Sequence, residues 1–128
     1  MALSRELRSN KESFIEIGRY INKCRIQRKK SIQQLSVKLG VNPSYLSEIE
    51  RGERVPDDYF IRSLKEHCGL DENYIFNCLG RSPLVAREEL DQHLVLQETL
   101  KEIGMSGLSK EEKEIIYRKF YEIAKSIL

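Results

Sequence analysis

Glycine and proline are scarce in this sequence, which has 7 glycines and 3 prolines among its 128 residues. No long stretch alternates valine, threonine or aromatic side chains with polar ones, so β-strands have little to be built from. Isoleucine and leucine are plentiful instead, and they recur at the spacing of amphipathic helices. The sequence therefore predicts an all-α fold.

Cysteine is also rare, and the three that occur are Cys24, Cys68 and Cys78. Their number is odd, no two are close in sequence, and each falls on an apolar position of a helical pattern. This arrangement indicates buried free thiols. No apolar run approaches the length of a membrane span, and residues 1–13 lack the apolar core of a signal peptide. We expect a cytoplasmic protein that does not contact membranes.

Residue groups that bind metals or carry catalysis are missing as well. The two histidines, His67 and His93, have no cysteine or carboxylate partners at metal-ligand spacing, so we expect no metal. Paired carboxylates, a nucleophile motif and a phosphate-binding loop are not recognisable in the sequence. We therefore expect neither an enzyme nor a bound cofactor.

The net charge of +2 hides a separation of the two signs along the chain. Residues 1–56 contain 12 Lys and Arg against 6 Asp and Glu, whereas residues 57–128 contain 10 against 14. A basic front half attracts phosphates, while an acidic rear half is repelled by them. The asymmetry suggests a binding end and a non-binding end.

Apolar side chains at helical spacing predict a first helix, and they are Phe14, Ile17, Ile21 and Cys24. Residues 1–12 either extend this helix or form a loose basic arm, and the sequence leaves both open. The basic stretch 25–30 follows. It is either a solvated helix end, where cations are favoured, or a set of phosphate contacts.

Two short helices joined by a tight turn come next. Ser31 is an N-cap, and Gly40 ends the first of the two because glycine readily adopts positive φ. The Asn42–Pro43 pair supplies the N-cap and the first residue of the second helix in the preferred order. The predicted inward side chains are Ile32, Leu35 and Leu39 on the first helix and Leu46 and Ile49 on the second.

Two further helices complete a first domain. Acidic residues at 57–58 begin the fourth helix, where they complement the helix dipole, and Gly69 ends it. A fifth helix spans 71–79, and the turn-forming residues 80–83 follow. We therefore predict a first domain over residues 1–82 and a second over residues 83–128.

The second domain is predicted to be a helical hairpin. Its first helix carries an apolar stripe from Leu90 to Ile103 and ends at 104–107, and a capping box at Ser109 begins the second. Two such helices cannot bury both stripes alone, which implies a partner surface, although a purely intradomain core is the alternative. The predicted dimerisation residues are Leu90, Leu94, Leu100, Ile103, Ile116, Phe120, Ile123 and Ile127.

The segment 14–79 resembles the Cro/repressor type of helix-turn-helix domain, often called the XRE family. The residues that carry the resemblance are Leu35, Gly40, Val41, Leu46, Ile49, Glu50, Gly52 and Pro56. The resemblance implies a five-helix helix-turn-helix DNA-binding domain, which the C-terminal helical hairpin follows. A generic helical bundle with solvated charges is the alternative.

The resemblance also implies which side chains meet DNA. The implied base contacts are Pro43, Ser44, Ser47 and Glu48. The implied phosphate contacts are Gln33, Asn42, Tyr45, Arg51, Arg54, Lys29 and Lys30. Arg25 and Glu50 occupy positions that form a structural ion pair in this family. The chain departs from the family at Ile32, where a glutamine is usual, so Gln33 is expected to supply that contact, and at Ser36, where alanine is usual.

The C-terminal segment is similar to the two-helix oligomerisation hook of Sin-type repressors of Gram-positive bacteria. The similarity rests on residues 88–92, the break at 104–108 and the Ser109 cap. In that family the hook forms dimers and is captured by small helical antagonist proteins. Both a second copy of the chain and such an antagonist are therefore expected partners.

Taken together, these patterns predict a sequence-specific regulator of transcription that binds double-stranded DNA. It would be a bacterial dimeric repressor that reads repeated or palindromic half-sites through the helix at 42–51. The alternative function is an antitoxin that autoregulates its own operon and masks a toxin with another segment.

Overall fold

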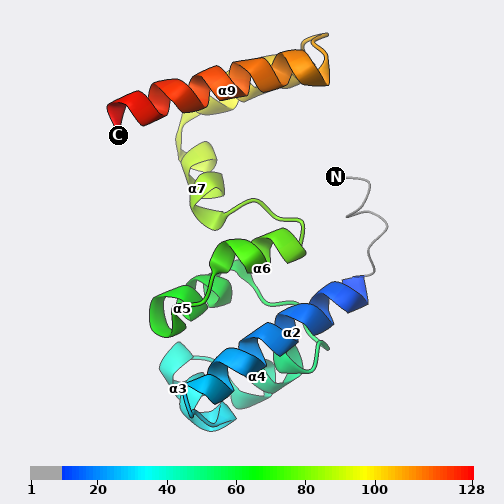
Figure 1. Cartoon of the computed structure of the whole chain (residues 1–128), viewed down its shortest axis with the longest axis vertical. Coiled ribbons are helices and arrows are strands. Elements are labelled where there is room, and N and C mark those ends of the chain that lie inside the picture. The colour runs from blue at the N-terminus through cyan, green and yellow to red at the C-terminus, as the bar shows by residue number, and fades with distance from the viewer. Residues whose placement is uncertain (1–9) are drawn as a thin grey trace. The chain divides into compact units, whose positions relative to one another are not determined.

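The computed structural model describes residues 10–128, which form eight α-helices and no strand (Figure 1). The all-α prediction is confirmed for this part of the chain. The first described helix, α2 (Asn10–Gln27), includes residues 10–12, which therefore extend the predicted helix. Residues 1–9, the rest of the segment for which an arm was the alternative, lie outside the described residues.

Five helices make up most of the first compact unit. After α2 come α3 (Ile32–Leu39), α4 (Pro43–Glu50), α5 (Asp58–Cys68) and α6 (Glu72–Cys78). The helix α2 packs against α4 and α6, α3 packs against α4 and α5, and α5 packs against α6 (Figure 1). The α3–α4 pair is thus held from two sides, because α4 packs against α2 and α3 packs against α5.

Local caps determine where these helices begin and end. The Ser31 hydroxyl accepts a hydrogen bond from the Gln34 backbone N–H at 3.0 Å, and the Gln34 side chain accepts one from the Ser31 N–H at 2.9 Å. Asp57 accepts a hydrogen bond from the Phe60 N–H at 2.8 Å. Gly40, with φ of 69°, turns the chain between α3 and α4 in a conformation that residues with a Cβ disfavour.

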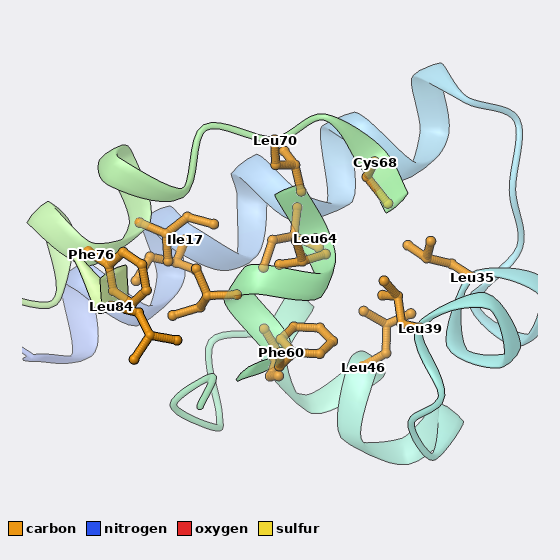
Figure 2. Packing of buried hydrophobic residues seen from close by; sticks show 14 residues of the cluster. Ile17, Leu35, Leu39, Leu46, Phe60, Leu64, Cys68, Leu70, Phe76 and Leu84 are labelled. Atoms are coloured by element: carbon orange, nitrogen blue, oxygen red, sulfur yellow. The ribbon is translucent and has the colours of Figure 1, made fainter. Parts of the chain in front are cut away.

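One apolar core holds the five helices together. Figure 2 shows Phe60 and Leu64 of α5 in its middle, with Leu35 and Leu39 of α3 on one side and Phe76 of α6 on the other. The other buried members are Ile17, Ile21, Leu46, Ile49, Ile61, Cys68, Leu70, Ile75 and Leu84. Each large apolar side chain buried in this way contributes about 1.5–3 kcal/mol.

The three cysteines are free thiols, but only Cys68 is buried. The prediction of burial is wrong for Cys24 and Cys78, which are half-buried because they pack against the edge of the core. Among residues 10–128, no helix combines the length and apolarity that a membrane crossing requires. The same residues contain no group of three or more His, Cys, Asp or Glu placed to hold a metal ion.

The helix α7 (Leu84–Gln92) begins as part of the first unit. Leu84 is buried in the core, and the Asp58 carboxylate of α5 accepts hydrogen bonds from Arg87 at 2.7 and 2.9 Å and from Arg81 at 3.2 Å. The chain divides into two compact units between Arg87 and Glu88. This division lies beyond the predicted boundary near residue 82, because the start of α7 packs with the first unit.

The second unit corrects one sequence expectation. The single helix predicted to carry both Leu90 and Leu94 is interrupted, since α7 ends at Gln92 and α8 (Leu94–Met105) begins after an extended His93 with φ of −127° and ψ of 103°. The Gln97 side chain donates hydrogen bonds to the carbonyls of Leu90 at 2.9 Å and Asp91 at 3.0 Å. It thus satisfies carbonyl groups that a continuing helix would have bound.

The last helix, α9 (Lys110–Ile127), follows a short turn and begins with the predicted capping box between Ser109 and Glu112. Neither α8 nor α9 has a fully buried side chain. On α9, Phe120, Ile123 and Ile127 are 59%, 62% and 80% exposed. In the single chain these side chains therefore do not form an intradomain core.

Candidate nucleic-acid interface

The N-terminus of α4 is built by its first residues. Asn42 has extended backbone angles, and its Oδ1 accepts a hydrogen bond from the Ser44 N–H at 2.8 Å. Pro43 occupies the first helical position, where its missing N–H costs nothing. Asn42, which was predicted to contact phosphate, therefore uses its side-chain oxygen to cap the helix.

One face of α4 is anchored and the opposite face is open. Leu46 and Ile49 are fully buried in the core, which fixes the rotation of the helix about its axis. A shallow groove runs between the start of α3 and the open face of α4. It is lined by Ser31, Ile32, Gln33, Pro43, Ser44, Ser47, Glu48 and Arg51. The groove thus brings together all four predicted base contacts with Gln33 and Arg51, two of the predicted phosphate contacts.

The chemistry of the groove is set by short polar side chains. Ser44 is exposed, while Ser47 and Glu48 are partly exposed. Residues 44 and 48 are one helical turn apart and therefore share a face. Hydroxyl groups both donate and accept hydrogen bonds, whereas a carboxylate only accepts, and these are groups that read base edges in the major groove.

Arg51 is held at the C-terminal end of α4 by two neighbours. Its Nη1 donates a hydrogen bond to the Ser47 hydroxyl, and its Nε and Nη2 both donate to Glu53 Oε2, at 3.1 and 3.0 Å. More than half of the Arg51 and Glu53 side chains is exposed, so solvent screens this pair. Arg51 thus lines the groove at the C-terminal end of α4.

Tyr45 lies on the side of α4 away from the groove. Its ring packs edge-on against Phe60 with centroids 5.1 Å apart, and its hydroxyl accepts from the Asp57 N–H at 3.1 Å and donates to Asp57 Oδ2 at 3.2 Å. The Arg54 guanidinium sits 5.4 Å from the Tyr45 ring centroid, and its Nε donates to Glu48 Oε2 at 2.6 Å. Burial raises the pKa of the Tyr45 hydroxyl, which therefore stays protonated as a donor.

The ends of α2 and α4 are joined by the predicted pair of Arg25 and Glu50. Arg25 Nε and Nη2 donate to the two Glu50 oxygens at 2.8 and 3.0 Å, and the Asn22 amide donates to the same carboxylate at 2.7 Å. The side chains of Arg25 and Glu50 are only 15% and 6% exposed. Arg25 also donates to the Lys30 carbonyl at 2.8 Å, which fixes the loop that leads to α3.

The basic residues of the stretch 25–30 fall into two groups. Some have side chains that are hydrogen-bonded within the domain, and the others are exposed. Arg25 belongs to the ion pair, and Arg28 donates a hydrogen bond to the Cys68 carbonyl at the end of α5. Lys29, with φ of 56°, and Lys30 are exposed beyond the end of α2. Within the stretch, Lys29 and Lys30 are thus the basic residues whose side chains make no hydrogen bond or ion pair with the described part of the chain.

Gly18 is a structural residue that sequence reasoning missed. A Cβ at this position would lie 2.5 Å from the backbone oxygens of Ile49 and Glu50. Only glycine therefore lets α2 approach the last turn of α4 this closely. An isolated glycine inside a helical pattern is the signal that could have revealed it, because such a glycine is unfavourable unless packing requires it.

Comparison with known protein families agrees with this geometry. The model of a family described as "Helix-turn-helix domain" matches residues 16–74. No curated protein matches the chain. A solved structure described as a SinR protein/SinI protein complex is similar at 23% sequence identity and a TM-score of 0.44, over 85% of this chain and 94% of that chain. The likeness to that structure is weak.

The family match covers α3, the turn at Gly40 and α4, together with most of α2 and all of α5. It confirms the helix-turn-helix part of the sequence prediction. The similarity of the C-terminal segment to a Sin-type hook stays a prediction. Residues 16–74 are therefore a helix-turn-helix domain, the type of domain with which DNA-binding transcription regulators contact the major groove.

Proposed function

We propose that this protein is a sequence-specific transcriptional repressor that binds duplex DNA as a dimer. The observation that carries the proposal is the groove on the open face of α4, which collects Pro43, Ser44, Ser47 and Glu48 on a helix whose other face is fixed in the core. A reading helix must be held rigidly, because hydrogen bonds to base edges tolerate little displacement.

Within this proposal the residues that contact DNA have two different tasks. Ser44 and Glu48 read base edges, and Glu48, as an acceptor, favours the N4 amine of cytosine. Gln33 at the start of α3 and the exposed Lys29 and Lys30 contact phosphates, which position the domain without reading sequence. We assign the protein no catalytic activity and place its action in the cytoplasm, where its DNA ligand lies.

Dimerisation is proposed to occur through the second unit. The apolar residues Phe120, Ile123 and Ile127 are mostly exposed on α9, and a second copy would bury them as the two hairpins form a four-helix assembly. A dimer presents two reading helices to one DNA molecule, with half-sites about 10 base pairs apart or a multiple of that distance. Binding through two domains raises the effective concentration of each, so each half-site is held more tightly.

The proposal is tested by selecting bound duplexes from a random library with the full chain. The affinity of the selected operator and of its single-base variants is then measured for the wild type, Ser44→Ala and Glu48→Ala. We expect each substitution to reduce discrimination at one base pair by about 1–3 kcal/mol. Glu66→Ala, which removes an exposed carboxylate from α5 outside the groove, is the matched control and should leave base preference unchanged. A selected pool without sequence preference would contradict the proposal.

A further inference from the structure

The Glu48 carboxylate is connected to the core by a continuous chain of contacts. Asp57 is fixed as the N-cap of α5 and holds the Tyr45 hydroxyl through two hydrogen bonds. The Tyr45 ring in turn supports the Arg54 guanidinium at 5.4 Å, and Arg54 Nε donates to Glu48 Oε2 at 2.6 Å. The orientation of Glu48 therefore depends on residues that the groove itself does not contain.

The two carboxylate oxygens of Glu48 differ in their surroundings. Oε2 is bound by Arg54, whereas Oε1 accepts no hydrogen bond from the part of the chain that the structure describes. Glu48 lines the groove on α4, but Arg54 does not. Arg54 thus binds the carboxylate from outside the groove and leaves one oxygen available to a ligand inside it.

A carboxylate at a DNA surface faces a physical difficulty. The phosphates around the major groove repel a negative charge, and a carboxylate that approaches a base edge also loses water. A neighbouring guanidinium compensates the charge and holds the acceptor in one orientation. Arg54 meets both requirements, because it contacts Glu48 directly and its planar group is supported by the Tyr45 ring.

We propose that Arg54 is a specificity-determining positioning residue that acts through Glu48, and that Tyr45 supports it. This inference rests on the proposed function, since it presupposes that Glu48 reads a base pair. It assigns Arg54 and Tyr45 a different role from the phosphate contacts that the family resemblance implied. In this role Arg54 determines which base pair is preferred. It contributes little to the sequence-independent affinity for DNA.

The structure gives reason to expect that this role can be separated from folding. Half of the Arg54 side chain and a third of the Glu48 side chain are exposed, at 52% and 34%. Exposed ion pairs contribute little to the stability of a free protein. Arg54→Gln should therefore leave the unfolding temperature nearly unchanged, so that an effect on base preference is not a consequence of unfolding.

A double-mutant cycle on the full chain tests the inference. Wild type, Arg54→Gln, Glu48→Gln and the double variant are compared on the selected operator and on its single-base variants, at several salt concentrations. We expect Arg54→Gln to reduce discrimination about tenfold at the base pair read by Glu48 and to leave the other positions unchanged. In the Glu48→Gln background, removal of Arg54 should have almost no effect, because its partner is gone.

Lys30→Gln is the control for a phosphate contact, and it should weaken all sequences alike and lower the salt slope by about one. If Arg54→Gln behaves like Lys30→Gln in both backgrounds, Arg54 contacts phosphate and the inference is overturned. An Arg54→Gln variant with unchanged base preference also overturns it. If the wild type itself shows no base preference, the proposed function and this inference fall together, and that outcome is distinct from the other two.

Discussion

Replacement of Gly18 by alanine is the perturbation whose effect the structure defines most closely. The new Cβ would lie 2.5 Å from the carbonyl oxygens of Ile49 and Glu50 and 2.9 Å from the Glu50 carbonyl carbon. All three atoms belong to the backbone at the end of α4, so no flexible side chain can move aside. The helices α2 and α4 must separate instead.

The size of the effect follows from two opposing contributions. In a helix interior, alanine is more favourable than glycine by about 1 kcal/mol. Carbon atoms normally approach other heavy atoms no closer than about 3.5 Å, so the helices must move apart by roughly 1 Å, and overpacking of this kind costs about 1–3 kcal/mol or more. The movement also strains the buried pair of Arg25 and Glu50. Because only backbone atoms meet the new Cβ, the upper end of this cost applies, and we expect a net loss of about 2 kcal/mol, or a fall of roughly 10 °C in the unfolding temperature.

Thermal unfolding followed by circular dichroism measures this loss. The matched control is Gly104→Ala, because Gly104 also lies inside a helix but has open space around its Cβ position. The control should be neutral or slightly stabilising for the second unit. An unfolding temperature of the first unit that stays constant or rises in Gly18→Ala would refute the reasoning about the contact between α2 and α4.

Three further predictions concern other parts of the molecule. Arg25→Ala should destabilise the first unit by about 3–5 kcal/mol in urea unfolding, because it leaves the buried Glu50 carboxylate without its guanidinium. Hydrogen bonds from Arg87 hold the pKa of Asp58 below its ordinary value, so the stability they provide is present above the pKa of the unfolded chain, about 3.9, and is lost as the pH falls through the lower folded value. Urea midpoints measured between about pH 2 and pH 6 should therefore fall less steeply toward acid in Asp58→Asn than in the wild type. Phe120→Glu should convert a sedimenting dimer to a monomer, because it places a charge in the proposed interface on α9.

Each of these three predictions has its own control and its own contrary outcome. Arg51→Ala breaks an ion pair that solvent screens and should change stability little, so equal losses in Arg25→Ala and Arg51→Ala would contradict the structural role of Arg25. Identical acid profiles of the wild type and Asp58→Asn would show that the Asp58 pairs add no stability. Tyr59→Glu places the same charge on an exposed aromatic position of α5 and should leave the dimer intact. A wild type that sediments as a monomer at micromolar concentration would contradict the dimer itself.

Local chemistry explains how much of the helix-turn-helix could be predicted from the sequence. Ser31, Gly40 and Asn42 act on backbone groups within a few residues, so their roles are visible without knowledge of the fold. The apolar spacing of Leu46 and Ile49 placed the inner face of α4, and the outward position of the candidate base contacts follows from the helical period.

Roles that depend on distant segments were not predictable in the same way. The close approach at Gly18 involves the end of α4, and the Tyr45 hydroxyl bonds to Asp57, which follows in a later segment. The interruption at His93 accompanies side-chain hydrogen bonds from Gln97 that compete with helix continuation, whereas the apolar spacing alone favours one continuous helix. Packing and side-chain hydrogen bonds determine these features. The spacing of apolar residues along the sequence does not reveal them.

The central claim is that the open face of α4 reads base pairs, and a change of specificity tests it most directly. Binding sites are selected separately from random duplexes with the wild type and with Glu48→Gln, at the same salt concentration. A carboxylate accepts from cytosine N4, while a glutamine amide pairs with adenine N6 and N7. We expect the two selected sites to differ at one position of each half-site, with cytosine replaced by adenine, and identical selected sites would contradict the reading of base pairs by α4.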